Sequence, residues 1–405
     1  MKLLCTLLIL SAMLYLSRAA HADTQSGASG ESSILEVVPN AYSGTTGTGT
    51  FLGPLSNAQR TYQLLIHANQ LTNLVGKALT GFSMRIPASA TANWPAADLT
   101  YTNYDVYLSG SVDPVNRSLT FANNIVGPQT KVRSGALFIP ANSYTFGGSP
   151  NAFGPVIAFN TAWIYTGGNL LVEIRHQGFS GTSRSTDALL TSTPGYASDF
   201  SACWTGSYTG TAGSQGNFTV IQLNAVDPQV LQLTALIEGM YDAGANLMVS
   251  DTTKVYLRNS NSPYDLVDSA KGVLGTSGTG TFYFTNAVSG VNYYIVVSHR
   301  NSIDTWSNAG YSFTSNSLSF DYTTAASQAF GSNQVLKGSR YTIYSGDANK
   351  DGTIDASDLS LIDNDATNFV SGYVATDLNG DSFVDGSDYS IADNNAFLFI
   401  SVIRP

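Results

Sequence analysis

The sequence has few of the residues that cross-link proteins or carry out most enzyme chemistry. Its 405 residues include two cysteines, Cys5 and Cys203, and four histidines, and charged residues make up only 11% of the chain. Soluble domains usually carry roughly 25% charged residues. Because Cys5 falls in a segment that we expect to be removed, Cys203 has no partner and an intrachain disulfide is excluded. Stability must therefore come from hydrophobic cores and bound metal.

The first 22 residues have the pattern of a signal peptide. Lys2 precedes an apolar run from Leu3 to Leu16, and Ala20-His21-Ala22 supplies small residues for cleavage. This run is short for a membrane span, and no later stretch comes near the length that a span needs. We therefore predict a signal peptide at 1–22, a Ser/Gly-rich linker at 23–32, a secreted or cell-surface protein, and no membrane span in the mature chain. The alternative is a retained N-terminal anchor.

No catalytic constellation is apparent in the rest of the chain. His67, His176 and His299 lie far apart, and neither His-x-His nor His-Glu-x-x-His occurs. Cys203 has no histidine near it in sequence, so we expect a buried structural cysteine. Carboxylates are few before residue 225, and none is paired in sequence as glycoside hydrolysis requires. The sequence favours a non-catalytic protein and leaves a glycoside hydrolase in the first β domain as the alternative.

Two long stretches have the short, alternating strands of β-sandwiches. In 33–225, Tyr104–Leu108 and Leu170–His176 alternate apolar and polar residues, and only 69–75 suggests a helix. In 229–344, Lys254–Leu257 and Tyr293–Val297 are among the expected strands. Clusters of Gly, Pro and Asn separate the strands. The pattern predicts a jelly-roll-like antiparallel sandwich at 33–225 and an Ig-like or transthyretin-like antiparallel sandwich at 229–344.

The negative charge of the chain is concentrated near its end. The net charge is −10, and residues 346–395 alone contain eleven Asp and one Lys, so the remainder is close to neutral. We infer a local metal-binding feature. The sequence shows no basic patch that could neutralise phosphates, which argues against nucleic acid as a partner.

Two runs in this acidic segment place oxygen-bearing side chains at calcium-loop spacing. Each run has carboxylate or amide oxygens at positions 1, 3, 5, 9 and 12, and position 7 can add a backbone carbonyl. Calcium prefers about six to eight oxygen ligands, which this spacing can supply. We therefore predict two bound calcium ions. The expected ligands are Asp347, Asn349, Asp351, Thr353, Asp355 and Asp358 in the first loop, and Asp377, Asn379, Asp381, Phe383, Asp385 and Asp388 in the second.

The loops belong to a longer duplication. The stretch 357–371 recurs at 387–401, with Ser, Asp, Asn, Ala and Phe at matching places. We expect a helix after each loop, at about 358–371 and 388–400. The apolar face of the first helix is predicted to comprise Leu359, Leu361, Ile362 and Phe369, and that of the second Ile391, Phe397 and Phe399.

Positions 6 and 8 are expected to shape the loops. Gly352 makes the sharp turn of the first loop, but the second has Ser382, which must adopt a positive φ or distort the turn. Ile354 and Val384 at position 8 are expected to pair the two loops back to back. Because the clustered carboxylates repel one another without a cation, we expect the segment to be largely unfolded without calcium.

This duplicated loop–helix unit resembles a dockerin domain of the type I kind, the calcium-dependent docking module of secreted bacterial proteins. The resemblance covers about residues 345–405, and Asp at position 12 and the strand-like Arg340–Gly346 before the first loop distinguish it from an ordinary EF-hand. It implies a cohesin-like docking protein as partner. The matching contact positions are Ala356, Ser357, Asp363 and Asn364, and Gly386, Ser387, Asp393 and Asn394.

One loop of the first stretch combines aromatic residues with Gly and Ser. Trp204 and Tyr208 lie at 198–208 and could stack on sugar rings, which makes polysaccharide an alternative partner. Because tryptophan is usually largely buried, the competing interpretation is that both residues cap the core.

The sequence thus predicts a mainly β, non-catalytic modular protein. Two tandem antiparallel β-sandwich domains precede a small α-helical, dockerin-like calcium domain at 345–405 that docks to another protein. One alternative is a carbohydrate-binding or polysaccharide-degrading accessory protein. Another is a calcium domain that only caps the neighbouring sandwich.

Overall fold

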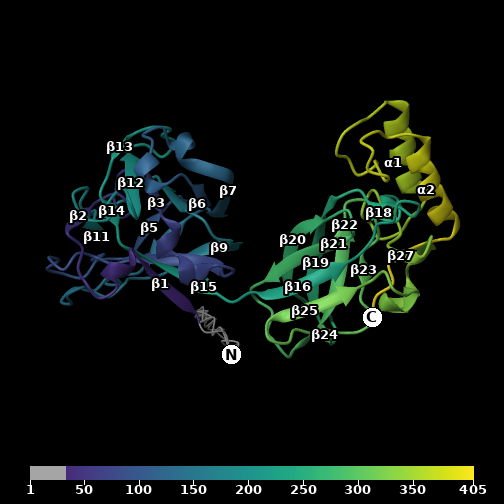
Figure 1. Cartoon of the computed structure of the whole chain (residues 1–405), viewed down its shortest axis with the longest axis horizontal. Helices are drawn as coiled ribbons and strands as arrows, with labels where there is room; N and C mark the ends of the chain where they lie inside the picture. The colour runs from purple at the N-terminus through teal and green to yellow at the C-terminus, as the bar shows by residue number, and fades with distance from the viewer. Residues whose placement is uncertain (1–32) are drawn as a thin grey trace, which may run out of the picture. The chain divides into compact units, whose positions relative to one another are not determined.

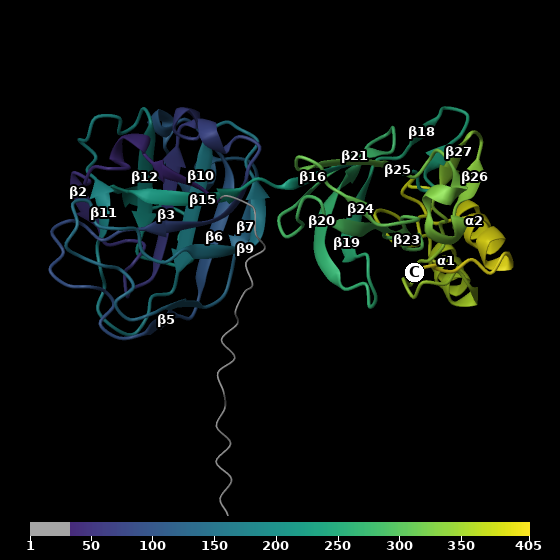
Figure 2. The same ribbon diagram turned by 90° about the horizontal axis from the view of Figure 1, so that it is seen from below.

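The structure is a computed structural model that describes residues 33–405 (Figures 1 and 2). The predicted signal peptide at 1–22 and linker at 23–32 lie outside the described residues. The described chain is mainly β with two α-helices, which confirms the predicted mainly β class. Within 33–405, no helix is long and apolar enough to cross a membrane.

The first β region, residues 34–226, contains two large antiparallel sheets. One sheet has the order β1 (Ile34–Val38), β15 (Ile221–Val226), β4 (Ala78–Met84), β9 (Ile157–Ile164). The other has the order β13 (Ser214–Gln215), β12 (Phe200–Thr205), β3 (Arg60–Ile66), β10 (Leu170–His176), β6 (Tyr104–Ser111), β7 (Ile125–Arg133). Smaller sheets are β14 (Phe218–Thr219), β11 (Thr186–Leu189), β2 (Gly49–Phe51), and β5 (Leu99–Tyr101) with β8 (Leu137–Ile139).

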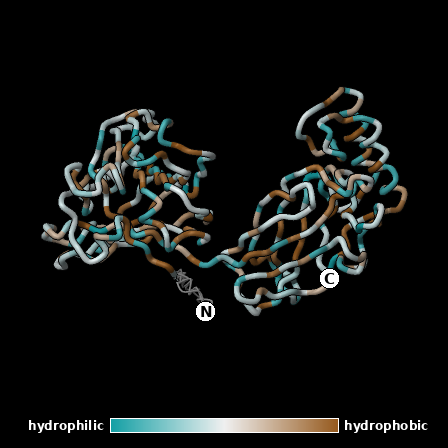
Figure 3. The backbone as a smooth tube through the Cα atoms, in the orientation of Figure 1, coloured by the Kyte–Doolittle hydropathy of each residue, from teal (hydrophilic) through white to brown (hydrophobic). Residues whose placement is uncertain are grey.

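One hydrophobic core lies between these sheets, as expected for a β-sandwich. Leu170, Val172 and Ile174 alternate along β10 and belong to this core. Figure 3 shows the hydrophobic stretches along the strands. The predicted helical stretch at 69–75 forms only two short 3-10 helices, η2 (Ala68–Gln70) and η3 (Thr72–Leu74). The other 3-10 helices here are η1 (Asn40–Tyr42), η4 (Pro114–Asn116) and η5 (Phe121–Asn124).

Residues 229–342 form the second β region. It contains one parallel strand pair, so the prediction of a purely antiparallel sandwich was wrong. Strand β16 (Gln229–Thr234) pairs antiparallel with β21 (Thr279–Phe284) but parallel with β25 (Ser317–Asp321). A parallel pair needs a long connection, which short-range sequence patterns do not reveal.

A five-stranded sheet contains β20 (Leu266–Leu274), β19 (Asp251–Asn259), β22 (Asn292–His299), β23 (Thr305–Trp306) and β24 (Tyr311–Ser312). Short pairs are β17 (Tyr241–Asp242) with β18 (Leu247–Met248) and β26 (Val335–Lys337) with β27 (Arg340–Thr342), and 3-10 helices are η6 (Ala326–Gln328) and η7 (Phe330–Ser332).

The C-terminal segment, residues 343–405, contains helices α1 (Ala356–Thr367) and α2 (Gly386–Phe397), which lie side by side in Figures 1 and 2. Both helices begin two residues before the predicted starts and end before the predicted ends at 371 and 400. The early start follows from capping boxes, in which Asp355 and Asp385 are the N-caps. A small core cluster within 362–392 lies in this segment. Ile354 of the first loop instead belongs to the core of the second β region.

A buried ion pair ties part of the first β region together. The Arg85 guanidinium donates to the Asp187 carboxylate at 2.8 Å, and the two side chains are only 1% and 3% exposed. Arg85 also donates to the carbonyls of Tyr42 and Thr45, and the backbone of Gly47 donates to Asp187. The pair therefore holds the segment 42–47 against the β-sheets.

We predict that Asp187→Ala lowers the free energy of unfolding by about 3–5 kcal/mol, because it leaves the Arg85 charge buried without a counter-charge. Asp227→Ala is the matched control, since Asp227 pairs with Lys77 where both side chains are partly exposed and such pairs contribute about 0–1 kcal/mol. Urea unfolding followed by circular dichroism measures both. Equal losses for the two variants would contradict the prediction.

Candidate calcium and docking site

The two predicted calcium loops have the same backbone arrangement. In the first, the Asp358 carboxylate accepts hydrogen bonds from the backbone of Ala348, Asn349 and Asp355 at 2.9, 3.1 and 3.0 Å. The Asp388 carboxylate accepts the equivalent bonds from 378, 379 and 385 in the second loop. Position 12 of each loop therefore closes the loop onto its own start.

The carboxylates at positions 1 and 12 are buried, whereas the other predicted ligands lie at the surface. Asp347, Asp358, Asp377 and Asp388 are at most 2% exposed. The ligands at positions 3, 5, 7 and 9 are exposed, except that Asn379 is half-buried. Each loop thus combines two buried acids with residues that lie at the surface.

Burial leaves one of these acids without adequate solvation. Desolvation raises the pKa of Asp347 to about 6, against the opposing effect of Lys350, and the neighbouring charges of Asp358 and Asp351 raise it further. Its Oδ1 atom is buried and has no hydrogen-bond partner. Burial also raises the pKa of Asp388. An unpartnered buried carboxylate oxygen in an oxygen-rich loop fits a hard cation such as calcium.

The loop oxygens are not gathered around one point in this structure. Among residues 33–405, no three His, Cys, Asp or Glu side chains form a ready-made metal cluster. Instead, Asp351 and Asp381 accept hydrogen bonds from the backbone of Thr353 and Phe383 at 3.0 and 2.9 Å. Calcium binding would require the exposed side chains to turn inward towards the buried carboxylates. The predicted ligands are therefore of the chemical kind that calcium prefers, but in this structure they do not surround a common point.

A cation of the protein lies beside the first acid of each loop. The Lys350 ammonium is 3.7 Å from the Asp347 carboxylate and 3.1 Å from Asp304 of the second β region. The Arg300 guanidinium is 3.6 Å from the Asp377 carboxylate. Both cations would repel calcium at the loop that they neighbour.

The loops do not pair back to back, so that expectation was wrong. The backbone of Ile354 donates to Ile400 at 2.9 Å, and that of Val384 donates to Val370 at 3.0 Å. Each loop therefore pairs with the residues that follow the helix of the other repeat. Ser382 has a φ of 71°, which confirms the positive φ expected when glycine is replaced there.

Buried polar side chains join the C-terminal segment to the second β region. Asn395 of α2 donates to Glu238 at 2.6 Å and to the Ser345 carbonyl at 2.8 Å. Asn301, which is fully buried, donates to the Asp377 carbonyl at 2.8 Å. Because the Asp377 carbonyl belongs to a predicted calcium loop, the two parts are connected at the site itself.

A second set of contacts surrounds Asp251 of β19. Tyr373 donates to its carboxylate at 2.6 Å, and Arg300 and His299 contact it at 2.9 and 3.0 Å. Although burial disfavours the charged form, these hydrogen bonds together hold the pKa of Asp251 well below its usual range. Arg300 also lies over the Tyr373 ring at 4.6 Å. The sequence did not predict this junction, because its contacts join residues that are 48 to 122 positions apart.

The predicted apolar helix faces were partly wrong. Ile362 is buried, but Phe369 and Phe399 are 89% and 88% exposed, and Phe397 is 81% exposed. The helices end at 367 and 397, and Phe369 and Phe399 then adopt φ values of 52° and 54°. The left-handed backbone ends the helical period that the prediction extended to these residues.

All the predicted partner contacts are accessible. Ala356, Ser357, Asp363 and Asn364, and their equivalents Gly386, Ser387, Asp393 and Asn394, are exposed. The segment therefore presents two equivalent polar surfaces, each followed in the chain by an exposed phenylalanine.

The predicted sugar contacts are largely engaged within the protein. Trp204 packs against the core of the first β region, and the Arg60 guanidinium lies 5.1 Å from its ring. Tyr208 donates to Asp105 at 2.8 Å. These contacts agree better with a capping role than with an open stacking surface.

The isolated histidine and cysteine of this region are packed inside it. His176 stacks on Tyr104 at 5.4 Å, and burial lowers its pKa to about 4. Cys203 is buried and free, and burial raises its pKa to about 12. The predicted burial of Cys203 is confirmed.

We predict that Lys350→Gln tightens calcium binding at the first loop by about 30-fold. A unit charge about 4 Å from another contributes roughly 1 kcal/mol in water, and a divalent ion doubles this. Calorimetric titration of the whole chain measures the change, with Lys77→Gln as the charge-matched control outside the site. Unchanged affinity would show that Lys350 does not act on bound calcium.

Asn395→Ala is expected to lower the free energy of unfolding by about 1–3 kcal/mol, because it removes the side-chain donor to the Ser345 carbonyl and leaves Glu238 with the Ser345 backbone as its donor. Asn394→Ala is the control, since the neighbouring side chain is exposed. Both variants are unfolded in urea at saturating calcium. Identical stabilities would indicate that the junction contributes nothing.

Comparisons with known proteins give little further information. No family model and no curated protein matches the chain. Two matching solved structures are type II Cohesin-X-Dockerin complexes from Acetivibrio cellulolyticus. The chain from a C-terminal interface mutant is 16% identical, with a TM-score of 0.27, over 41% of this chain and 94% of that chain. The chain from an N-terminal interface mutant is 17% identical, with a TM-score of 0.24, over 42% and 92%. At these values, the resemblance is too weak to assign a family.

Proposed function

We propose that residues 345–405 form a dockerin-like module that binds two calcium ions and docks a secreted protein to a cohesin-like partner. Phe369 and Phe399 carry this proposal, because large aromatic side chains are almost fully exposed at matching places in the two repeats. Exposed apolar surface of this kind commonly marks a protein–protein contact. The eight exposed positions at 356–364 and 386–394 would supply the polar part of the contact.

Calcium would stabilise the form that presents these residues. Both helices are twelve residues long, which is near the length at which an isolated helix is marginal. Binding at a calcium concentration of about 100 times Kd contributes roughly 2.7 kcal/mol for each site. The ion would relieve the desolvation of Asp347 and keep α1 and α2 in place. The hydrogen bonds of Asn395 and Asn301 also suit the alternative in which the module only caps the second β region.

Docking and capping differ in their response to exposed substitutions. We expect Phe369→Ser with Phe399→Ser to weaken binding at least about 30-fold, the loss expected for central interface aromatics, while leaving calcium affinity unchanged. Leu336→Ser is the control, because Leu336 is 55% exposed in the second β region. Surface plasmon resonance against purified type I and type II cohesins, with calcium and with chelator, measures binding.

A second variant tests the polar positions. Asp363→Arg with Asp393→Arg should abolish calcium-dependent binding, since it reverses two charges on the proposed contact surface. If no cohesin binds, capture from the surface proteins of the producing bacterium can identify another partner for the same variants. The docking proposal fails if neither double variant changes any interaction of the secreted chain, and the capping alternative then remains.

A further inference from the structure

The outer face of the second β region carries cations that the sequence alone does not bring together. Along β19, Val255 and Leu257 are buried, whereas Lys254, Tyr256 and Arg258 lie on the opposite face. Lys254 is exposed and lies 5.9 Å from the Tyr256 ring, and Arg258 lies 6.0 Å from the same ring. Cations and an aromatic ring therefore alternate along one strand.

Two lysines face each other across this sheet. Lys254 of β19 is paired in register with Lys271 of β20, and both side chains are exposed. In the described part of the chain, neither lysine forms an ion pair with a carboxylate. Like charges directly opposite one another destabilise a sheet. Residue pairs that destabilise a fold in this way are often found at functional sites, so the two lysines indicate a binding surface.

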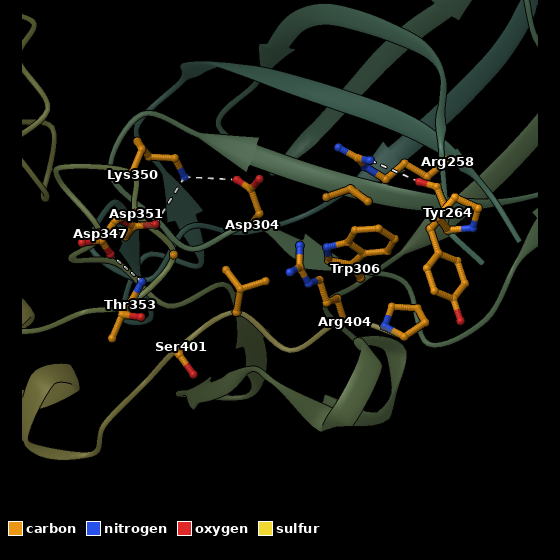
Figure 4. Close-up of a pocket in the computed structure, with 15 residues that line it drawn as sticks. Arg258, Tyr264, Asp304, Trp306, Asp347, Lys350, Asp351, Thr353, Ser401 and Arg404 are labelled. Carbon is orange, nitrogen blue, oxygen red and sulfur yellow. Dashed lines mark hydrogen bonds and ion pairs between the residues drawn. The ribbon is translucent and has the colours of Figure 1, made fainter. Parts of the chain in front are cut away.

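Two hollows extend along this face. One, with a volume of about 330 Å³, is lined by Lys254, Tyr256, Lys271 and Arg300 and by no carboxylate. The other, of about 670 Å³, includes Arg258, Tyr264, Trp306 and Arg404 (Figure 4). Lys350 lines both hollows. Their volumes lie within the roughly 300–1,000 Å³ of small-ligand sites.

Contacts within the protein hold Arg258 of the larger hollow in place without neutralising its charge. The Arg258 guanidinium lies 5.4 Å from the Trp306 ring and donates to the Tyr264 carbonyl at 3.2 Å. Trp306 is only 6% exposed, so it supports Arg258 and offers little surface to a ligand. Within residues 33–405, neither Arg258 nor Arg404 has a carboxylate partner. Their planar guanidinium groups suit bidentate contact with a carboxylate.

The acids that remain in the larger hollow have other roles. Asp304 pairs with Lys350, and Asp347 and Asp351 belong to the first predicted calcium loop. Calcium bound there would neutralise the two loop acids and make the hollow more positive. This effect of calcium on the charge of the larger hollow rests on the proposed function, whereas the presence of the cationic face does not.

We propose that this face binds an acidic oligosaccharide, with carboxylate groups at Lys254, Lys271 and Arg258. Hydroxyl groups of Thr252 and Ser298 line the smaller hollow and can bond to sugar hydroxyls. Nucleic acid fits less well, because base stacking needs free aromatic faces, and here cations flank Tyr256 while Trp306 is nearly buried. The ligand class is therefore a sugar chain that carries uronate residues.

The test is calorimetric titration of the whole mature chain with a hyaluronan hexasaccharide at low salt and saturating calcium. The uronate-bearing hexamer should bind, and an uncharged chitin hexamer should not. Added salt should weaken the binding, because the contacts are charged and exposed. Absence of binding to the uronate hexamer would overturn the proposal.

Lys254→Gln with Lys271→Gln should weaken binding about tenfold, an effect of about 1.4 kcal/mol. Lys77→Gln with Lys131→Gln removes the same charge from the first β region and should leave the affinity unchanged. Circular dichroism verifies that each variant folds. Equal weakening by both double variants would overturn the proposal, because the effect would then depend only on net charge.

Two further probes separate the remaining explanations. Hexaglutamate or a single-stranded DNA hexamer binding as tightly as the sugar would indicate a general polyanion surface and overturn the saccharide assignment. A chelator should weaken sugar binding if calcium neutralises the loop acids. If calcium binds but the chelator leaves sugar affinity unchanged, the inferred effect of calcium on sugar binding is wrong. Failure to bind calcium at all contradicts the proposed function.

Discussion

The C-terminal segment depends on buried hydrogen bonds that it makes with the second β region. Asn395 donates to Glu238 at 2.6 Å, and Asn301 donates to the Asp377 carbonyl at 2.8 Å. A buried amide without these partners would pay the full cost of desolvation. The orientation of α2 and the position of the second loop are therefore determined by residues outside the duplicated repeats.

The C-terminal segment has only a small hydrophobic core of its own. Ile354 contributes to the core of the neighbouring β region instead. A segment cut at 340 would lose Asn301, Glu238 and the apolar contacts around Ile354. The repeats are consequently recognisable as a unit in sequence but share their stabilising contacts with the preceding region.

Local patterns allowed much of this arrangement to be predicted, because they reflect interactions between nearby residues. Strand alternation located β6 and β10, and the repeated loop spacing placed a helix after each loop to within two residues of its start. The exposure of Phe369 was missed because a helical period was extended past the residue at which the backbone turns. The parallel strand pair and the opposition of Lys254 with Lys271 depend on register between distant segments, which one sequence does not specify.

The pairing of Ile354 with Ile400 has a mechanical consequence. The first loop and the residues after α2 lie together, and Val402 donates to the Gly352 carbonyl at 2.8 Å. Asn333 of the second β region also donates to the Ser401 carbonyl at 2.8 Å. Tension applied to the exposed helices would therefore be shared between this bond and the bonds of Asn301 and Asn395. Load would pass into the second β region through several parallel connections, and the single peptide link near residue 345 would be spared.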